Sequence, residues 1–302
     1  PDMNGFEVCE QLQSDRRFSD IPVIFISALS ETIDKVKAFN SGGVDYITKP
    51  FHFEEIEARV ATHLSLRRYE KSLENLVQEK IGEIVNSQMS TIFALSKLAE
   101  SRDTDTGAHI ERVQIMCKTL SKRLSEKLPY SGAIGLDFVN CIYNASPLHD
   151  IGKVAIPDNI LLKPGKLTSD EFEMMKTHAV IGASTLQKVY QQYPNNAFIA
   201  MGISIAHSHH ERWDGKGYPN GLAGETIPLE ARIMAVVDVY DALRSKRCYK
   251  ESLSRNRSLD IIESGSGTQF DPVLVKAFLD VEEEFNTIGT EIDQLTKPFF
   301  LS

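Results

Sequence analysis

Six of the eight histidines lie between residues 102 and 302, in company with acidic residues in apolar surroundings. They are His109, His149, His178, His207, His209 and His210. His149 is followed directly by Asp150, and Asp238 closes the apolar run 234–238. Burying an unpaired carboxylate is costly, so an acid in such a run indicates a specific partner. The groups recur at intervals of about 30 residues, which predicts that successive helices deliver them to one central site.

A metal ion is the partner that best explains this set. Adjacent helical residues do not face each other, so His149 and Asp150 converge only on a point beside their helix. Imidazoles and carboxylates without thiolates suit Fe, Mn, Ni, Co or Zn, and Asp150 is able to bridge two ions. Two ions roughly 3.5–4 Å apart are a standard arrangement for attack on a phosphodiester. We therefore predict at least two divalent ions and phosphodiester chemistry.

The residues around these ligands resemble the HD-GYP subfamily of HD-superfamily phosphohydrolases. His149-Asp150 matches the HD signature, and Gly217-Tyr218-Pro219 matches the tripeptide that names the subfamily. Further motifs follow in the same order as in the family: 101–103, 106–112, 149–153, 156–158, 163–167, 209–219, 238–243 and 270–272. The resemblance implies a phosphodiesterase that linearises, and in some members fully hydrolyses, cyclic di-GMP.

The resemblance also implies roles for individual residues. The implied metal ligands are His149, Asp150, His178, His209, His210 and Asp238, with Asp150 bridging. Lys153 would contact the scissile phosphate or protonate the leaving oxygen, which places it with Asp150 as a catalytic residue. Arg247 and Lys250 match a phosphate-binding segment, and cations suit a ligand with two phosphates. Tyr218 would line the substrate groove.

Two departures and two alternatives accompany this interpretation. Some family members hold a third ion through a Glu four residues before a His, where this chain has Asp105 before His109. Asp is one methylene shorter, so a third ion there is disfavoured. Cys248 replaces a common Pro in the phosphate-binding segment without removing charge. The alternatives are a cyclic-dinucleotide sensor or scaffold with little catalysis, and a hydrolase of a related cyclic dinucleotide or another nucleotide.

The elements that must position these residues fall into three stretches. Residues 102–302 are helical patterns broken by loops, which predicts an all-α domain of about seven helices. Residues 1–63 alternate apolar runs with a helical pattern. The runs 22–26 and 44–48 predict strands, the first buried on both faces, with a helix over 33–40 closed by a glycine pair. This is half of an α/β sheet.

The first stretch resembles the C-terminal half of a response-regulator receiver domain, a flavodoxin-like fold. The landmarks are 1–5, Ser27-Ala28 and Lys49-Pro50-Phe51. The resemblance implies that Ser27 senses a phosphoryl group, that Lys49 neutralises it, and that a sensor histidine kinase acts on the intact receiver. The acidic pair and the phosphoacceptor Asp of that family are expected to precede Pro1, so this chain would not be phosphorylated there.

Residues 64–101 predict a long linker helix without proline. A heptad seam of mainly apolar residues, with one frame slip, runs through 66, 69, 73 and 76, then through 77, 81, 84, 88, 91, 95 and 98. Such a seam favours a coiled-coil homodimer, and the alternative is an amphipathic helix along its own domain. Gln88 and Thr91 in the seam suit a helix that shifts register.

Composition limits the class of protein. The chain has 302 residues, 42% hydrophobic, and 33 Lys and Arg against 42 Asp and Glu, for a net charge of −9. No apolar run approaches the roughly 18–20 residues of a membrane span, so we expect no membrane insertion. The acidic balance disfavours general nucleic-acid binding. Four scattered cysteines without a CxxC pair suit a reducing compartment, and we predict a cytoplasmic protein.

Overall fold

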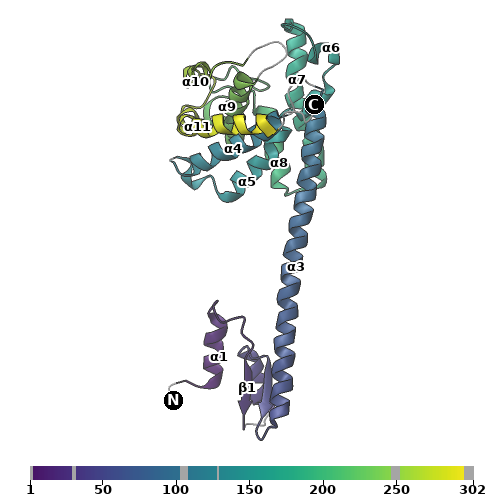
Figure 1. The fold of residues 1–302 in the computed structure, drawn as a ribbon, viewed down its shortest axis with the longest axis vertical. Helices are drawn as coiled ribbons and strands as arrows, with labels where there is room; N and C mark the ends of the chain where they lie inside the picture. The colour runs from purple at the N-terminus through teal and green to yellow at the C-terminus, as the bar shows by residue number, and fades with distance from the viewer. Residues whose placement is uncertain (1–2, 29–31, 103–107, 128, 246–251, 296–302) are drawn as a thin grey trace. The chain divides into compact units, whose positions relative to one another are not determined.

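The protein is described by a computed structural model that covers residues 3–28, 32–102, 108–127, 129–245 and 252–295. The chain divides into two compact units, Pro1–Ser87 and Gln88–Ser302. Helix α3 (Phe53–Glu100) begins in the first unit and ends in the second (Figure 1). Within the described residues, none of the helices is both long enough and apolar enough to cross a bilayer.

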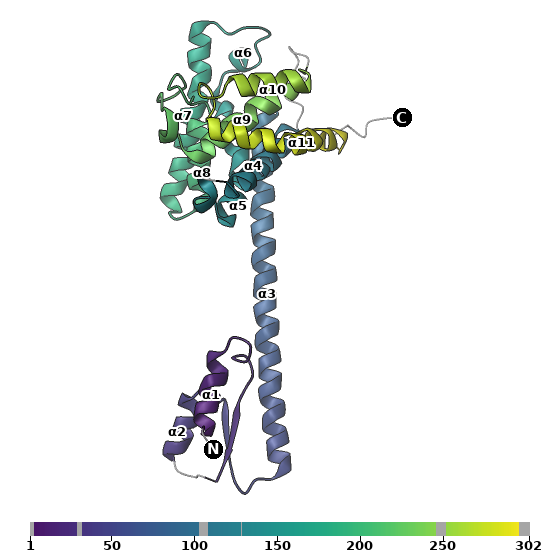
Figure 2. The same cartoon turned by 90° about the vertical axis from the view of Figure 1, so that its left-hand side faces the viewer.

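The first unit contains a parallel β-α-β arrangement. Strands β1 (Ile24–Ser27) and β2 (Asp45–Thr48) pair in parallel and are joined through helix α2 (Thr32–Asn40). Helix α1 (Gly5–Ser14) is capped by Asn4, whose side chain accepts from two backbone N–H groups of the first turn. Figure 2 shows α1 and α2 beside the two strands. Both predicted strands and the predicted helix are therefore confirmed.

The prediction that the first strand is buried on both faces is wrong. Ile26 of β1 is 43% exposed, and Ile24 is only half-buried. Within the described residues the sheet has only two strands, so one edge of β1 has no neighbouring strand, and Ile24 and Ile26 line an open pocket between the sheet and α3. At the carboxyl end of the strands the backbone N–H of Lys49 donates to the carbonyl of Ser27, at 2.8 Å. The two predicted receiver switch residues thus lie next to each other.

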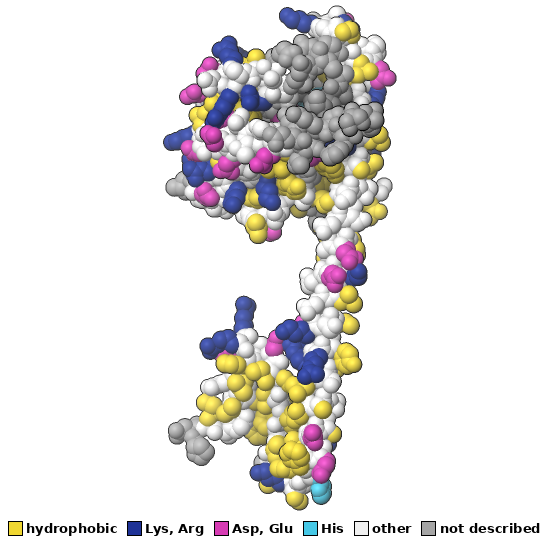
Figure 3. Space-filling model, in the orientation of Figure 1, with side chains coloured by type: hydrophobic (Ala, Val, Ile, Leu, Met, Phe, Trp, Pro, Cys, Tyr) yellow, Lys and Arg dark blue, Asp and Glu magenta, His cyan; other side chains and the backbone are white. Residues whose placement is uncertain are grey.

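The long helix α3 keeps its predicted seam exposed. Seam residues on both sides of the boundary between the units are about half exposed or more: Leu66, Tyr69, Leu73, Leu76, Val77, Ile81, Ile84, Leu95 and Leu98. Figure 3 shows hydrophobic side chains along this helix. In the second unit a different face of α3 packs inward, with Ser96 and Ala99 buried. The helix is confirmed, and its seam is not the face that packs on the second unit.

The second unit is built from helices. They are α4 (His109–Ser125), α5 (Leu136–Ala145), α6 (Asp158–Leu161), α7 (Ser169–Gln192), α8 (Ala197–Ser208), α9 (Leu229–Arg244), α10 (Arg255–Ser264) and α11 (Pro272–Leu295). Short 3₁₀ turns η1 (Tyr130–Gly132), η2 (Ser146–Leu148), η3 (Ile151–Ala155) and η4 (Gly224–Thr226) connect them. The described part of this unit holds isolated β-bridges but no strands, which fits the predicted all-α class.

The core of this unit forms around α9, which is buried on most of its faces. Val113 of α4, Val236 of α9 and Phe278 of α11 belong to one fully buried cluster. A second cluster joins Leu148 of η2 to Leu186 of α7, with Ile92 of α3 packed against it. These two clusters fix α4, η2, α7 and α9 against one another, and all four carry or adjoin the predicted ligands.

Candidate metal centre

The His149-Asp150 pair lies between two 3₁₀ turns, η2 and η3, and not within the α-helix that the sequence suggested. Asp150 has backbone angles φ −106° and ψ 12°, and its Oδ2 lies 3.2 Å from Nε2 of His149. The turn also approaches α7 closely, because a Cβ atom on Gly152 would lie 2.0 Å from the carbonyl oxygen of His178. Gly152 is required for this approach, which brings Asp150 to α7.

One group of candidate ligands gathers around Asp150. His178 comes from α7, and His209 and His210 follow directly after α8. One ligand atom from each of these four residues lies within 4.8 Å of the others. The carboxylate oxygen Oδ1 of Asp150 is 3.3 Å from Nε2 of His178 and 3.7 Å from Nε2 of His209. The arrangement is that of a single ion's ligand shell.

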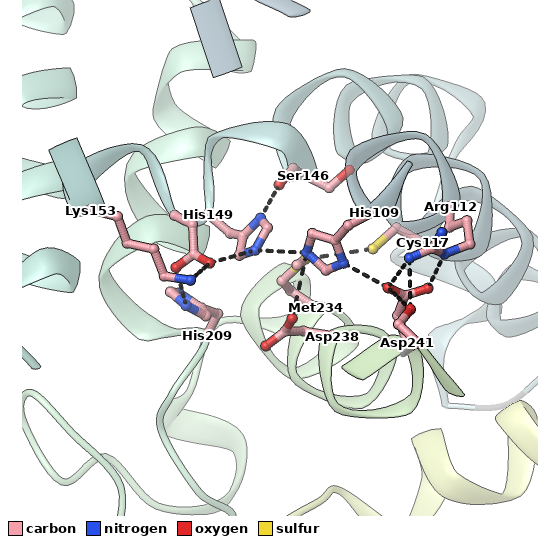
Figure 4. A network of polar contacts seen from close by, with 12 residues as sticks. His109, Arg112, Cys117, Ser146, His149, Lys153, His209, Met234, Asp238 and Asp241 are labelled. Atoms are coloured by element: carbon pink, nitrogen blue, oxygen red, sulfur yellow. Dashed lines mark hydrogen bonds and ion pairs between the residues drawn. The ribbon is translucent and has the colours of Figure 1, made fainter. Parts of the chain in front are cut away.

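A second group consists of His109, His149 and Asp238, whose ligand atoms also lie within 4.8 Å of one another. His109 is the first residue of α4, and Asp238 lies on α9. Nε2 of His109 is 3.4 Å from Nε2 of His149 and 3.7 Å from Oδ1 of Asp238. Figure 4 shows the three side chains pointing toward one another. His109, expected only near a third ion, thus lies beside two of the main predicted ligands.

The Asp150 carboxylate lies between the two groups. Its Oδ1 faces His178 and His209, while its Oδ2 is 3.2 Å from Nε2 of His149. Lys153 also reaches Oδ2, with Nζ at 2.8 Å. One oxygen toward each group is the geometry that a bridging carboxylate requires.

The ring nitrogens show that a cation fits here. Four Nδ1 atoms are held by oxygens: His109 by Asp241 Oδ2 at 2.7 Å, His149 by the Ser146 carbonyl at 2.9 Å, His178 by the Met175 carbonyl at 2.6 Å, and His209 by the Ile205 carbonyl at 3.0 Å. Because these oxygens accept, each Nδ1 carries a proton, and each ring in its neutral form presents a lone pair at Nε2.

At His178 and His209 the lone pair of Nε2 has no donor to meet. Nε2 of His178, Nε2 of His209 and Oδ1 of Asp150 are buried without a hydrogen-bond partner. Buried acceptors that face one another are costly unless a cation lies between them. The residues present therefore fit divalent ions held by imidazole and carboxylate.

The protonation of the Asp150 group suits metal binding. Burial lowers the pKa of His178, and burial together with the neighbouring His209 lowers that of His210 well below its usual value. Burial alone would raise the pKa of Asp150, but the charges of Lys153 and His149 hold it well below its usual range. His178 and His210 thus offer neutral imidazoles and Asp150 an ionised carboxylate, the forms that bind metal.

His109 behaves differently. Burial opposes its protonation, but the hydrogen bond and charge of Asp241, with the charge of Asp238, raise the pKa of His109 to about 9. Arg112 forms a bidentate pair with Asp241, which is 1% exposed. The site around His109 is thus strongly favourable to positive charge, whether from a proton or from a metal ion.

Comparison with known protein families identifies two domains in this chain. Residues 94–274 match the family model described as HD domain, and residues 1–61 match the response regulator receiver domain. The chain belongs to the HD-domain family. The HD domain follows a receiver segment, so both resemblances predicted from the sequence are confirmed.

Several relatives match most of the length of this chain. A probable cyclic di-GMP phosphodiesterase of Vibrio cholerae is 43% identical over 96% of this chain and 67% of its own length. The cyclic di-GMP phosphodiesterase response regulator RpfG of Xanthomonas campestris is 38% identical over 92% of this chain and 72% of its own. A 3'3'-cGAMP-specific phosphodiesterase of Vibrio cholerae is 39% identical over 67% and 36%, respectively.

Sequence reasoning assigned no role to the Arg112–Asp241 pair of the HD domain. Asp241 follows Asp238 by three residues on α9, and Arg112 follows His109 by three residues on α4. Residues three apart share a helical face. That spacing was the signal from which the pair could have been predicted. A cation three residues after one candidate ligand and an acid three residues after another can form an ion pair that supports the metal ligands.

Glu211 also received no role, although it holds the loop of the predicted tripeptide. Its buried carboxylate accepts from the backbone N–H groups of Asn220 at 2.8 Å and Leu222 at 3.0 Å. Within the loop, a Cβ atom on Gly217 would lie 2.4 Å from the backbone nitrogen of Arg212, so this position requires glycine. Tyr218 is thereby brought to His210, with ring centroids 4.7 Å apart.

The other predicted site residues have different outcomes. Asp105, Arg247 and Lys250 lie outside the described residues, and Cys248 does as well. Ser27 and Lys49 lie in the first unit at the carboxyl end of the strands. Lys153 contacts the candidate ligand Asp150, and the ring of Tyr218 lies against that of His210.

Proposed function

We propose that this chain is a metal-dependent phosphodiesterase that hydrolyses cyclic di-GMP to linear pGpG, GMP or both. The observation that supports it best is the Asp150 carboxylate, which turns one oxygen to each of two ligand groups beside Lys153. The names of relatives at 43% and 38% identity support the substrate.

Two divalent ions would be held by seven residues. His178, His209 and His210 would bind one ion, His109, His149 and Asp238 the other, and Asp150 both. When bound, such ions supply Lewis acidity toward the phosphate and activation of water near neutral pH. The Nδ1 hydrogen bonds orient the rings before any ion arrives, and Asp150 remains ionised beside Lys153.

The remaining residues would act on the substrate. Lys153 would donate to the scissile phosphate or protonate the leaving oxygen, since its Nζ lies at the edge of the ligand groups. Arg247 and Lys250 would bind phosphate oxygens, as the sequence resemblance implies. Tyr218 would line the groove, because its ring already stands against His210.

Control would come from the receiver segment. Ser27 and Lys49 would respond to phosphorylation of an intact receiver by a sensor kinase, which the receiver match supports. The exposed seam of α3 would form a parallel coiled coil in a homodimer. A cytoplasmic location would match both the kinase and the substrate.

The decisive experiment combines metal analysis with product chromatography. Purified protein loaded separately with Fe, Mn, Ni, Co or Zn should contain about two ions per chain and convert cyclic di-GMP. Asp150→Ala should lose at least one ion and all hydrolysis, because its carboxylate serves both groups. Asp150→Ala protein with full metal content and normal turnover would contradict the two-ion assignment.

Two other functions are tested by the same assay. The relative named as 3'3'-cGAMP-specific supports a related cyclic dinucleotide as an alternative substrate, so both compounds are compared at equal concentration. A sensor or scaffold would bind cyclic di-GMP without turnover under every metal. The full ligand set and Lys153 favour an enzyme, because a pure binder has no need of them.

A further inference from the structure

A pocket of about 290 Å³ opens next to the candidate ligands, between α7, α9 and the loop of Tyr218. Its lining includes the ligands His209, His210 and Asp238 at one end. At the other end are Phe172 and Lys176 of α7, to which neither the sequence motifs nor the ligand geometry assigns a role. The volume is below that of a site for a whole drug-sized ligand, so it suits one part of a cyclic dinucleotide.

The pocket has a continuous aromatic wall. The rings of His210 and Tyr218 lie 4.7 Å apart at an angle of 31°, and Phe172 meets Tyr218 edge to face, with centroids 6.3 Å apart. Phe172 is nevertheless 46% exposed. A large aromatic ring left open beside a polar pocket offers a free surface for stacking.

The ammonium group of Lys176 lies over the rings of this aromatic wall. Nζ of Lys176 is 5.1 Å from the centroid of Phe172 and 5.7 Å from that of Tyr218. Its side chain is 26% exposed and pairs with the more exposed Glu173 at 2.6 Å. Lys176 therefore presents hydrogen-bond donors over two aromatic faces.

We propose that Phe172 and Lys176, with Tyr218, form a nucleobase subsite in which a guanine of the substrate stacks on Phe172. Lys176 donates to the O6 and N7 acceptors that guanine presents together, whereas adenine pairs N7 with an amino donor. This inference rests on the proposed phosphodiesterase activity and adds the base that the site selects.

Substitutions on α7 test the stacking. Phe172→Ala should raise the KM for cyclic di-GMP about tenfold, because base stacking on an aromatic side chain is lost. The kcat and the metal content should change little, and Phe172→Trp should restore the KM. Tyr193→Ala is the matched control, since Tyr193 is an exposed aromatic residue at the other end of α7 and does not line the pocket.

The lysine is tested by discrimination between bases. Lys176→Met keeps the apolar stem and removes the charge, so it should reduce the preference for cyclic di-GMP over cyclic di-AMP several-fold. Lys188→Met on the same helix is the control. An unchanged KM in Phe172→Ala, or an unchanged preference in Lys176→Met, would overturn the corresponding assignment. Wild-type protein that fails to hydrolyse cyclic di-GMP with any metal would instead contradict the proposed function itself.

Discussion

Substitutions at Lys153 distinguish effects on metal binding from effects on the phosphate chemistry. It contacts Asp150 but offers no lone pair when charged, so it is no ligand itself. Lys153→Ala should leave metal content unchanged and lower kcat, by roughly 10²–10⁴-fold if the lysine acts as an acid. Lys153→Arg keeps the charge but loses a transferable proton, so recovery of kcat in that variant would assign an electrostatic role. Normal turnover in Lys153→Ala would exclude both roles.

Asp241 supports the site through His109. Asp241→Asn removes the charge that orients the ring and favours a cation, so affinity for one of the two ions should fall about 10–100-fold. Asp271→Asn is the matched control, because Asp271 is a buried carboxylate that pairs with Arg232 outside the ligand groups. Metal titration measures the loss of metal affinity, and the melting temperature of the metal-free protein measures the loss of stability. Equal loss of stability with equal metal affinity would leave Asp241 a purely structural residue.

Among the elements, the loop from His209 to Leu222 depends on Glu211. Two backbone N–H groups of the loop end on its carboxylate. Glu211→Gln leaves a single accepting oxygen, so one part-buried N–H loses its partner, at a cost near the lower end of about 1–3 kcal/mol. We expect a lower melting temperature and a several-fold higher KM with unchanged metal content, because Tyr218 loses its fixed position. The exposed Glu225→Gln is the control. A KM equal to that of the control would show that the loop holds Tyr218 without this anchor.

For the whole molecule, the seam of α3 predicts a dimer whose register can change. Gln88 and Thr91 interrupt an otherwise apolar seam, which leaves two registers close in energy. In the protein with a complete receiver domain, Gln88→Leu with Thr91→Leu should lock one register and abolish the response of activity to phosphorylation. Light scattering should report a dimer throughout. Glu79→Leu, off the seam, should keep the response, and a monomeric double variant that still responds would contradict the coiled coil.

The sequence by itself determined the classes of element and the kinds of ligand. Periodicity is a local property, so it located β1 and α2 within a few residues, and it located α3 from residue 64 to its end. The types of residue at 149, 150, 178, 209, 210 and 238 limited the chemistry to imidazole and carboxylate ligation before any fold was known.

Other features depend on packing between helices that are distant in the sequence, and only the tertiary structure shows them. The pairing of His109 with Asp238 and Asp241 joins α4 to α9, and no local pattern reports a contact over that separation. The two directions of the Asp150 oxygens depend on the turn between η2 and η3, which packs closely against α7. The exposed face of β1 and the aromatic wall from His210 to Phe172 were equally hidden, because exposure depends on which layers cover a residue and not on the residue itself.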